Sequence, residues 1–299
     1  MRLTPDVAAA IAGGAPVVAL ESSVLAQGLP VPANREACER MLCGVQASGA
    51  VPAILAVCGG EPCAGLDRDD LERFLRRDGI RKLSARDLAA AMAARADGAT
   101  TVAATLVLAR RAGIAVFATG GIGGVHRVPP YDESADLLEL SRTPVIVVCA
   151  GAKSVLDVRA TSERLESLGI PVVGYRTGEL PGFFTSETGI PLSTRVESAA
   201  EVAAIFTAHR GLGLPSAVVV VQPLPADVAL PRQVVDAAVE GALSRATRED
   251  IRGASLTPFL LAEIERATEG RSLGANLALL EANARLAGEI AVELARGEG

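Results

Sequence analysis

One lysine stands where covalent chemistry is easiest to place in this chain. Lys153 follows the apolar segment Val145–Cys149, which predicts a buried strand, and sits in a turn of small residues. Open α/β sheets bind their ligands at the carboxyl ends of such strands. Of the 29 basic residues, only Lys82 and Lys153 are lysines. Arginine keeps its proton in a protein, whereas a desolvated lysine can become a neutral amine nucleophile. We therefore predict that Lys153 attacks a carbonyl carbon. The alternative, which we consider weaker, is that Lys153 is a solvated surface lysine that caps a turn.

A carboxylate ends a second apolar strand. Glu21 follows Val17–Leu20 directly. At that place a carboxylate is either a cap for the following turn or a partly desolvated general acid. The residue types alone leave these two interpretations open.

A glycine-rich loop follows the predicted strand Ile114–Ala118. The loop Thr119–His126 departs from a dinucleotide fingerprint because His126 takes the third glycine position. Its glycines still suit close backbone approach to a phosphate or an oxyanion. His126 is one of two histidines and is a candidate for phosphate binding or acid–base chemistry. Lys82 could hold a phosphate as a point charge.

Two further polar segments each allow a structural and a functional interpretation. In Tyr131–Asp136, either Asp132 or Ser134 could cap the helix that continues through Leu140, or the carboxylates could bind Mg²⁺ or Mn²⁺. Asn276 opens the last predicted helix, so it could be a plain N-cap.

The composition limits the class of protein. Of the 299 residues, 49% are hydrophobic and 3% aromatic, which predicts a large aliphatic core. The net charge of −6 and the scattered arginines argue against a nucleic-acid partner. Five cysteines without a CxxC pair suggest reduced thiols, and we expect neither a signal peptide nor a membrane span. The sequence therefore predicts a soluble, cytoplasmic protein.

Predicted strands alternate with predicted helices along nearly the whole chain. This alternation predicts one largely parallel central sheet with helices on both faces, folded as a single α/β domain over residues 1–299. The further predicted strands are Val51–Val57, Ile170–Tyr175 and Ala217–Gln222. The predicted helices are Arg35–Ala47 with Asn34 as N-cap, Asp67–Arg77, one after Ser84, Thr100–Ala112, one from about Ser154, Glu197–Ala208, Arg232–Arg245, Pro258–Thr268 and Asn276–Ala295. We read Gly59–Gly65 as a loop.

Six motifs occur in an order that resembles the pseudouridine-5′-phosphate glycosidase family, which includes the indigoidine synthase A-like proteins. They are Ala19–Ser23, Asp97–Thr105, Phe117–Arg127, Ser134–Leu137, Val148–Ser154 and Thr257–Leu261. The resemblance covers essentially the whole chain. It implies a three-layer α/β/α sandwich, a homotrimer, and reversible cleavage of the C–C glycosidic bond of pseudouridine 5′-phosphate to uracil and ribose 5-phosphate.

The resemblance also implies roles for individual residues. Lys153 would form an imine with C1 of the opened ribose, Glu21 would move the proton, and Asp132 would bind Mn²⁺. The positions around the sugar phosphate and the base would be Lys82, Val102, Thr119, His126, Ser134, Ala135, Asp136 and Asn276. An ordinary pair of glycosidase carboxylates does not suffice for a C–C bond, whereas one amine and one carboxylic acid do.

The sequence departs from the family pattern at a few positions. Gly274 replaces a usually basic residue, Gln222 replaces an asparagine, and Glu133 replaces an apolar residue beside the metal position. The loop Arg127–Tyr131 is shorter than in some relatives. Two other functions compete with this one. The first is a class I aldolase-like lyase, which would also use Lys153 but would need no uracil pocket. The second, favoured only if Glu133 and Gly274 spoil the site, is a sugar-phosphate-binding relative without turnover.

Overall fold

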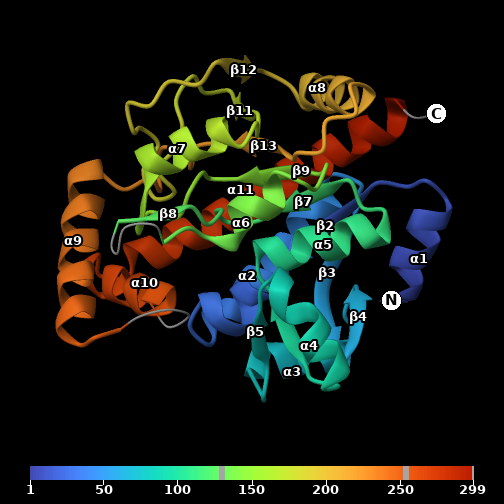
Figure 1. The fold of residues 1–299 in the computed structure, drawn as a ribbon, viewed down its shortest axis with the longest axis horizontal. Coiled ribbons are helices and arrows are strands. Elements are labelled where there is room, and N and C mark those ends of the chain that lie inside the picture. Colours follow the sequence, from blue (N-terminus) through green and yellow to red (C-terminus); the bar gives the residue numbers. More distant parts are fainter. Residues whose placement is uncertain (128–131, 252–255, 298–299) are drawn as a thin grey trace.

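A computed structural model describes residues 1–127, 132–251 and 256–297 (Figure 1). Its centre is a sheet of eleven strands in which β1, β4, β3, β2, β7, β9, β13, β11 and β12 lie side by side. The pair β5 and β6 joins this sheet through β3. The strands are β1 (Arg2–Leu3), β2 (Val17–Glu21), β3 (Val51–Cys58), β4 (Glu61–Ala64), β5 (Arg81–Leu83), β6 (Gly98–Thr100), β7 (Val116–Ala118), β9 (Ile146–Cys149), β11 (Val172–Tyr175), β12 (Thr194–Val196) and β13 (Val218–Val221).

The pairing within this sheet is mostly parallel, as predicted. The contiguous run β3–β2–β7–β9–β13–β11–β12 is parallel throughout. Only β4 and β6 pair with β3 in the antiparallel sense. Parallel strands point their carboxyl ends to one edge, so the residues that follow β2, β7 and β9 meet there.

Helices cover both faces of the sheet and make the three layers that the family resemblance implied (Figure 1). The helices are α1 (Pro5–Ala12), α2 (Ala33–Ala47), α3 (Arg68–Arg76), α4 (Leu88–Ala93), α5 (Val102–Ala112), α6 (Ala135–Leu140), α7 (Val158–Ser167), α8 (Ala199–Gly211), α9 (Arg232–Arg248), α10 (Leu256–Ala267) and α11 (Arg271–Gly297). A π-helical turn, η1 (Val24–Gly28), and a 3₁₀ turn, η2 (Ala85–Asp87), complete the set.

Each face of the sheet carries its own hydrophobic core. Val18 and Leu20 of β2 pack with residues of α2, α8 and α11, whereas Val17 and Ala19 pack with residues of α1, α5 and α6. This alternation follows from the two-residue period of a strand. A strand that is buried on both faces reads as a continuous apolar run. For this reason the central strands could be found from the sequence.

The turn that carries Lys153 is tied to the glycine loop. Beyond β7 and β9 the parallel pairing continues through a bridge between Ile122 and Ala152. A small antiparallel pair, β8 (Val125–His126) with β10 (Leu156–Asp157), follows. The two loops after these neighbouring strands therefore form one structural unit.

Several local predictions were wrong. The helix after Lys153 begins at Val158, because β10 comes first and Asp157 caps the helix through the Ala160 N–H. Gly59–Gly65 is a hairpin that contains β4, because its residues pair with β3. Thr100 belongs to β6, and α5 begins only at Val102.

Asn34 does not cap α2, which is a further correction. The helix begins at Ala33, and the buried Asn34 amide donates to the carbonyls of Leu25 and Leu75, at 2.9 Å each. The side chain therefore fastens η1 and α3 to α2. Among the described helices, none is long and apolar enough to cross a bilayer.

Candidate active site

A cleft of about 390 Å³ lies at the carboxyl edge of the sheet. Nine of the eleven predicted site residues line it: Glu21, Lys82, His126, Asp132, Ser134, Ala135, Asp136, Lys153 and Asn276. These residues come from segments spread over more than 250 positions of the chain. The parallel topology brings them together, because the loops at one edge of the sheet form the cleft walls.

Glu21 is held by two hydroxyl groups. It is 4% exposed; Ser23 Oγ donates to one carboxylate oxygen at 2.7 Å, and Thr119 Oγ1 donates to the other. The carboxylate thus has a fixed orientation at the wall of the cleft. Thr119 was predicted as a substrate contact, but it is buried behind this wall and its hydroxyl lies on Glu21.

Hydrogen bonds at both its N–H and its carbonyl hold the backbone of Lys153 in place. Its N–H donates to the Ile122 carbonyl at 3.1 Å, and its carbonyl accepts from the Leu156 N–H at 2.9 Å. The side chain is half-buried and lines the cleft. Within the described residues its amine has no hydrogen bond or ion-pair partner. An amine without a partner in a cleft is positioned to react with a bound carbonyl.

The second lysine, Lys82 of β5, enters the same cleft. Its side chain is open to solvent, but the cleft walls surround much of it. This desolvation, and after it the positive charge of Lys153, lowers the pKa of Lys82, while Glu21 and Asp136 act in the opposite direction. Lys82 and Lys153 therefore repel each other, and this repulsion is relieved when an anion binds between them.

Replacing Lys82 by methionine should make the protein more stable and bind sugar phosphates less well. The lowered pKa means that the unfolded chain binds the proton more tightly than the folded protein does. Charged Lys82 therefore lowers the free energy of unfolding by its full amount below the lowered pKa. This loss of stability disappears as the pH approaches 10.5, the ordinary pKa of lysine. Thermal melts of the variant and the wild type should differ most near neutral pH and converge at high pH. A gap that stays constant with pH would contradict this electrostatic account.

Asp136 organises the glycine loop. It is 6% exposed, and its carboxylate accepts from the backbone N–H of Ala103 at 2.9 Å and of Gly123 at 2.8 Å. A side chain on Gly123 would overlap Ser134, so the loop can close on this carboxylate only with glycine there. Ser134, not Asp132, caps α6 by accepting from the Asp136 N–H at 3.2 Å. Asp136 therefore serves the loop architecture whether or not it also contacts a substrate.

His126 and Asp132 form a pair at one end of the cleft. His126 Nδ1 lies 3.3 Å from Asp132 Oδ2, and the Asp132 side chain is 45% exposed. Over the described part of the chain, no group of three or more His, Cys, Asp or Glu residues could hold a metal ion. The pair suits a hard cation only if water or phosphate oxygens supply most of its ligands. Residues 128–131, which include most of the short loop noted in the sequence, lie outside the described residues.

Val102 and Asn276 do not lie where the sequence predicted: Val102 is buried in the core, and Asn276 lies inside a helix. Val102 is 1% exposed and packs in the core below the cleft, which Thr101 lines in its place. Asn276 is not an N-cap, because α11 begins five residues earlier at Arg271. Instead it lies inside α11 and lines the cleft with 8% of its surface exposed.

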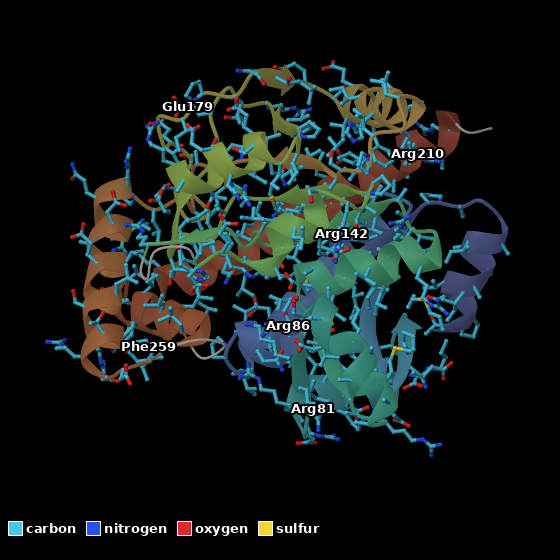
Figure 2. The ribbon with its side chains drawn as sticks, in the orientation of Figure 1. Arg81, Arg86, Arg142, Glu179, Arg210 and Phe259 are labelled. Atoms are coloured by element: carbon cyan, nitrogen blue, oxygen red, sulfur yellow. The ribbon has the colours of Figure 1, made fainter. Side chains whose placement is uncertain are left out.

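The sequence reasoning missed several residues of the cleft wall. They include Ser23, Gln27, Ser84, Arg86, Asp87, Thr101, Phe183 and Leu261. Ser23 could have been found, because it lies two residues after Glu21, beyond the strand end. Arg86, labelled in Figure 2, and Asp87 belong to η2, which follows Lys82 by a few residues. Phe183 comes from a distant loop and had no local signal.

A pair of side-chain amides, the buried Asn283 and the half-buried Gln222, supports the glycine loop. Asn283 of α11 is 1% exposed; its Nδ2 donates to the Thr119 carbonyl at 2.8 Å, and its Oδ1 accepts from Gln222 Nε2 at 2.9 Å. Gln222, one of the departures from the family pattern, is thus part of this network. The chain of contacts runs from Gln222 through Asn283 and Thr119 to Glu21.

Replacing Asn283 by leucine should damage both stability and turnover. The Thr119 carbonyl would stay buried without a partner, at a cost of about 1–3 kcal/mol, and the half-buried Gln222 amide would lose its partner as well. The displaced Thr119 would also orient Glu21 less well, so kcat should fall more than KM rises. Urea unfolding and steady-state kinetics measure the two effects. The matched change Gln222→Leu leaves the contact between Asn283 and the Thr119 carbonyl intact, so it should lower stability and kcat less. Equal losses in the two variants would contradict the proposed path of contacts from Asn283 through Thr119 to Glu21.

The other two departures lie away from the reacting groups. Glu133 forms a salt bridge with Arg164 at 3.0 Å. Gly274 is exposed, and a side chain there would meet open space. Neither residue blocks the cleft.

The sequence matches one protein family over nearly its whole length. The family model for indigoidine synthase A like protein matches residues 6–293. The chain belongs to the indigoidine synthase A-like family. The cleft is therefore that of a member of this family.

Relatives of this family member are closely similar along their whole length. A pseudouridine-5′-phosphate glycosidase of Gemmatimonas aurantiaca is 64% identical over 296 residues, which cover 99% of this chain and 97% of that protein. The protein of the same name from Herpetosiphon aurantiacus is 51% identical over 294 residues, with 98% and 97% of the two chains covered.

Two solved structures share the fold. The prealnumycin C-glycosynthase AlnA, in complex with ribulose 5-phosphate, superposes with a TM-score of 0.92 at 39% identity, and the match covers 99% of this chain and 97% of that one. An indigoidine synthase A-like protein from Thermotoga maritima gives a TM-score of 0.89 at 39% identity, with 95% and 94% covered.

Proposed function

We propose that this protein is an enzyme that reversibly cleaves the C–C glycosidic bond of pseudouridine 5′-phosphate, giving uracil and ribose 5-phosphate. One observation carries the proposal: the partnerless amine of Lys153 and the hydroxyl-bound carboxyl of Glu21 line the same cleft. The names of the two relatives, and the sugar phosphate bound to the C-glycosynthase, support the same chemistry. The reaction would belong to pseudouridine and nucleotide catabolism.

The residues of the cleft suffice for the covalent steps. The Lys153 amine attacks C1 of the ribose and the bond from C1 to the ring oxygen breaks; the nitrogen loses one proton and the freed oxygen gains one, so the nitrogen regains its lone pair. Glu21 then protonates the base carbon. As the C–C bond breaks, the nitrogen lone pair forms an imine with C1, and uracil leaves. Water hydrolyses the imine, which releases the aldehyde of ribose 5-phosphate and restores the amine.

The remaining predicted residues surround the reacting pair. Lys82 would attract the anionic substrate, and Asn276 would contact the base or the sugar from the α11 side. His126, Ser134 and Ala135 would hold the sugar phosphate at the other end. Thr119 and Asp136 would act through the groups that they position.

A hard divalent cation, Mn²⁺ by resemblance, would bind through Asp132 and would neutralise phosphate charge when bound. The donor set fits only a weak site, with water or phosphate oxygens as its other ligands. Asp132→Ala should therefore remove any response of turnover to added Mn²⁺, as measured with metal-stripped enzyme over a Mn²⁺ titration. If the metal-stripped wild type runs at full rate, Asp132 has no metal role.

The assembly and the location extend the proposal. The resemblance implies a homotrimer in the cytoplasm. Light scattering coupled to gel filtration tests the subunit number directly.

The decisive assay follows the loss of the ultraviolet signature of pseudouridine 5′-phosphate, with and without Mn²⁺. The proposed activity predicts equimolar uracil and ribose 5-phosphate. A class I aldolase-like lyase would instead cleave a free sugar phosphate and ignore the nucleotide. A relative that only binds sugar phosphates would bind ribose 5-phosphate without turning over either compound.

A further inference from the structure

A side chamber opens from the catalytic cleft. Its volume is about 230 Å³, and it shares Gln27, Gly28, Leu261 and Asn276 with the cleft. The rest of its wall is largely apolar and consists of Leu29, Pro30, Phe184, Ala262 and Leu273, with the polar exceptions Arg77, Glu265 and Ser272. A chamber with apolar walls and a few polar groups suits a small flat ring.

Two side chains in this wall carry buried polar atoms without a partner among the described residues. These atoms are Gln27 Oε1 and the Nε and Nη2 atoms of Arg77. Gln27 Nε2 donates to the Ile80 carbonyl at 3.3 Å, which leaves its oxygen as the free acceptor. Buried polar atoms are nearly always paired in folded proteins, so each such atom calls for an explanation. A ligand with complementary groups would provide one.

The charges in the chamber favour a neutral ligand. Arg77 and Glu265 both line it, so the positive charge of one is offset by the negative charge of the other. The phosphate has a better environment in the main cleft, where Lys82 and Lys153 lie together. The unpaired groups of the chamber are therefore the Gln27 oxygen, which can accept from an N–H, and the Arg77 guanidinium, which can donate to a carbonyl oxygen.

We propose that this side chamber binds the uracil base, with Gln27 accepting a hydrogen bond from a ring N–H and Arg77 donating to a ring carbonyl. The proposal rests on the proposed function. The sugar is bonded to C5 of the base, so the opposite edge presents N1–H, the C2 carbonyl and N3–H. That edge offers a donor beside an acceptor, as the two side chains require. Because their free atoms are buried, binding requires the amide and the guanidinium to turn towards the chamber.

The position of Gln27 in the chain supports this assignment. Gln27 lies in η1, which begins three residues after Glu21, so the proposed acid and the proposed base contact share one short segment. Binding of the base would thereby set the distance between Glu21 and the carbon that it protonates.

The synthetic direction gives the sharpest test, because the base and the sugar are then separate substrates. With saturating ribose 5-phosphate, Gln27→Met and Arg77→Met should each raise the KM for uracil by about tenfold or more, since each removes a buried hydrogen bond. Borohydride trapping of ribose 5-phosphate should stay within about twofold of the wild type, since the sugar does not use the chamber. The matched controls are Gln46→Met and Arg76→Met, at two exposed residues outside the chamber wall, and they should change neither value.

A second arm uses the unmodified protein and methylated bases. The wild type should discriminate against 1-methyluracil or 3-methyluracil, because one methyl group replaces the N–H that Gln27 accepts. In Gln27→Met this discrimination should be smaller. A smaller discrimination in the variant would show that Gln27 interacts with the ring N–H that the methyl group replaces. Discrimination that survives the substitution would overturn the assignment of Gln27.

The remaining outcomes separate the two proposals. If the wild type joins uracil to ribose 5-phosphate but uses both methylated bases as well as it uses uracil, the chamber proposal is wrong and the proposed function stands. The chamber proposal also fails if the variants lose sugar trapping and uracil binding together. If the wild type neither forms nor cleaves the nucleotide, the proposed function fails and the chamber assignment fails with it.

Discussion

Replacing Lys153 by arginine should abolish turnover as completely as replacing it by alanine. Both variants should lose a factor on the order of 10⁴ or more in kcat, as expected when an enzyme loses its covalent nucleophile. Arginine preserves the positive charge, but it keeps its proton and cannot form an imine. The comparison therefore separates a nucleophile from a simple anion-binding charge. Initial rates of pseudouridine 5′-phosphate cleavage measure the effect.

The control for the Lys153 variants is the integrity of the site. Thermal shift by ribose 5-phosphate should persist in Lys153→Arg, because the phosphate contacts remain and only the covalent step is lost. A Lys153→Arg variant that retains more than a small fraction of turnover would show that the lysine acts by charge alone.

Glu21→Gln should separate the two chemical steps. A positioned general acid contributes roughly a hundredfold to ten-thousandfold in rate, so C–C cleavage should fall by about that factor. Glutamine keeps the shape of the side chain; one of the Ser23 and Thr119 hydroxyls can still donate to its amide oxygen, while the other reorients to accept from its amide nitrogen. Lys153 should therefore still form an imine with ribose 5-phosphate, which borohydride trapping would detect.

The alternative outcomes for Glu21 are equally clear. Normal turnover of Glu21→Gln, or equal loss of trapping and cleavage, would mean that Glu21 does not act at the base carbon. The acid would then be His126 or Asp136. The Asp136 carboxylate already accepts two backbone N–H groups, so His126 would be examined first.

Much of the fold could be predicted because the central strands are buried on both faces. Runs such as Val145–Cys149 are apolar without interruption, and parallel strands require helices between them. The short edge elements carried no such signal. The strand Glu61–Ala64 looked like a loop because glycines flank it and a proline lies inside it, yet pairing with β3 decides its state. Long-range pairing of this kind overrides local propensity.

The reacting groups could also be predicted, since Lys153 and Glu21 each follow an apolar strand. Their supporting groups could not. Asn283 contacts the Thr119 carbonyl across 164 positions of the chain, and in the sequence it is one polar residue in an alanine-rich helix. Asn34 looked like a helix cap because its local context suits one, whereas its contacts come from η1 and α3. Local patterns do not specify such tertiary contacts.

The most direct test of the central claim is to locate the covalent adduct. The enzyme is incubated with ribose 5-phosphate and borohydride, digested, and mapped by mass spectrometry. The account predicts a single reduced sugar-phosphate adduct on Lys153, with Lys82 unmodified. An adduct on Lys82 alone, or no adduct from enzyme that is active on pseudouridine 5′-phosphate, would contradict it.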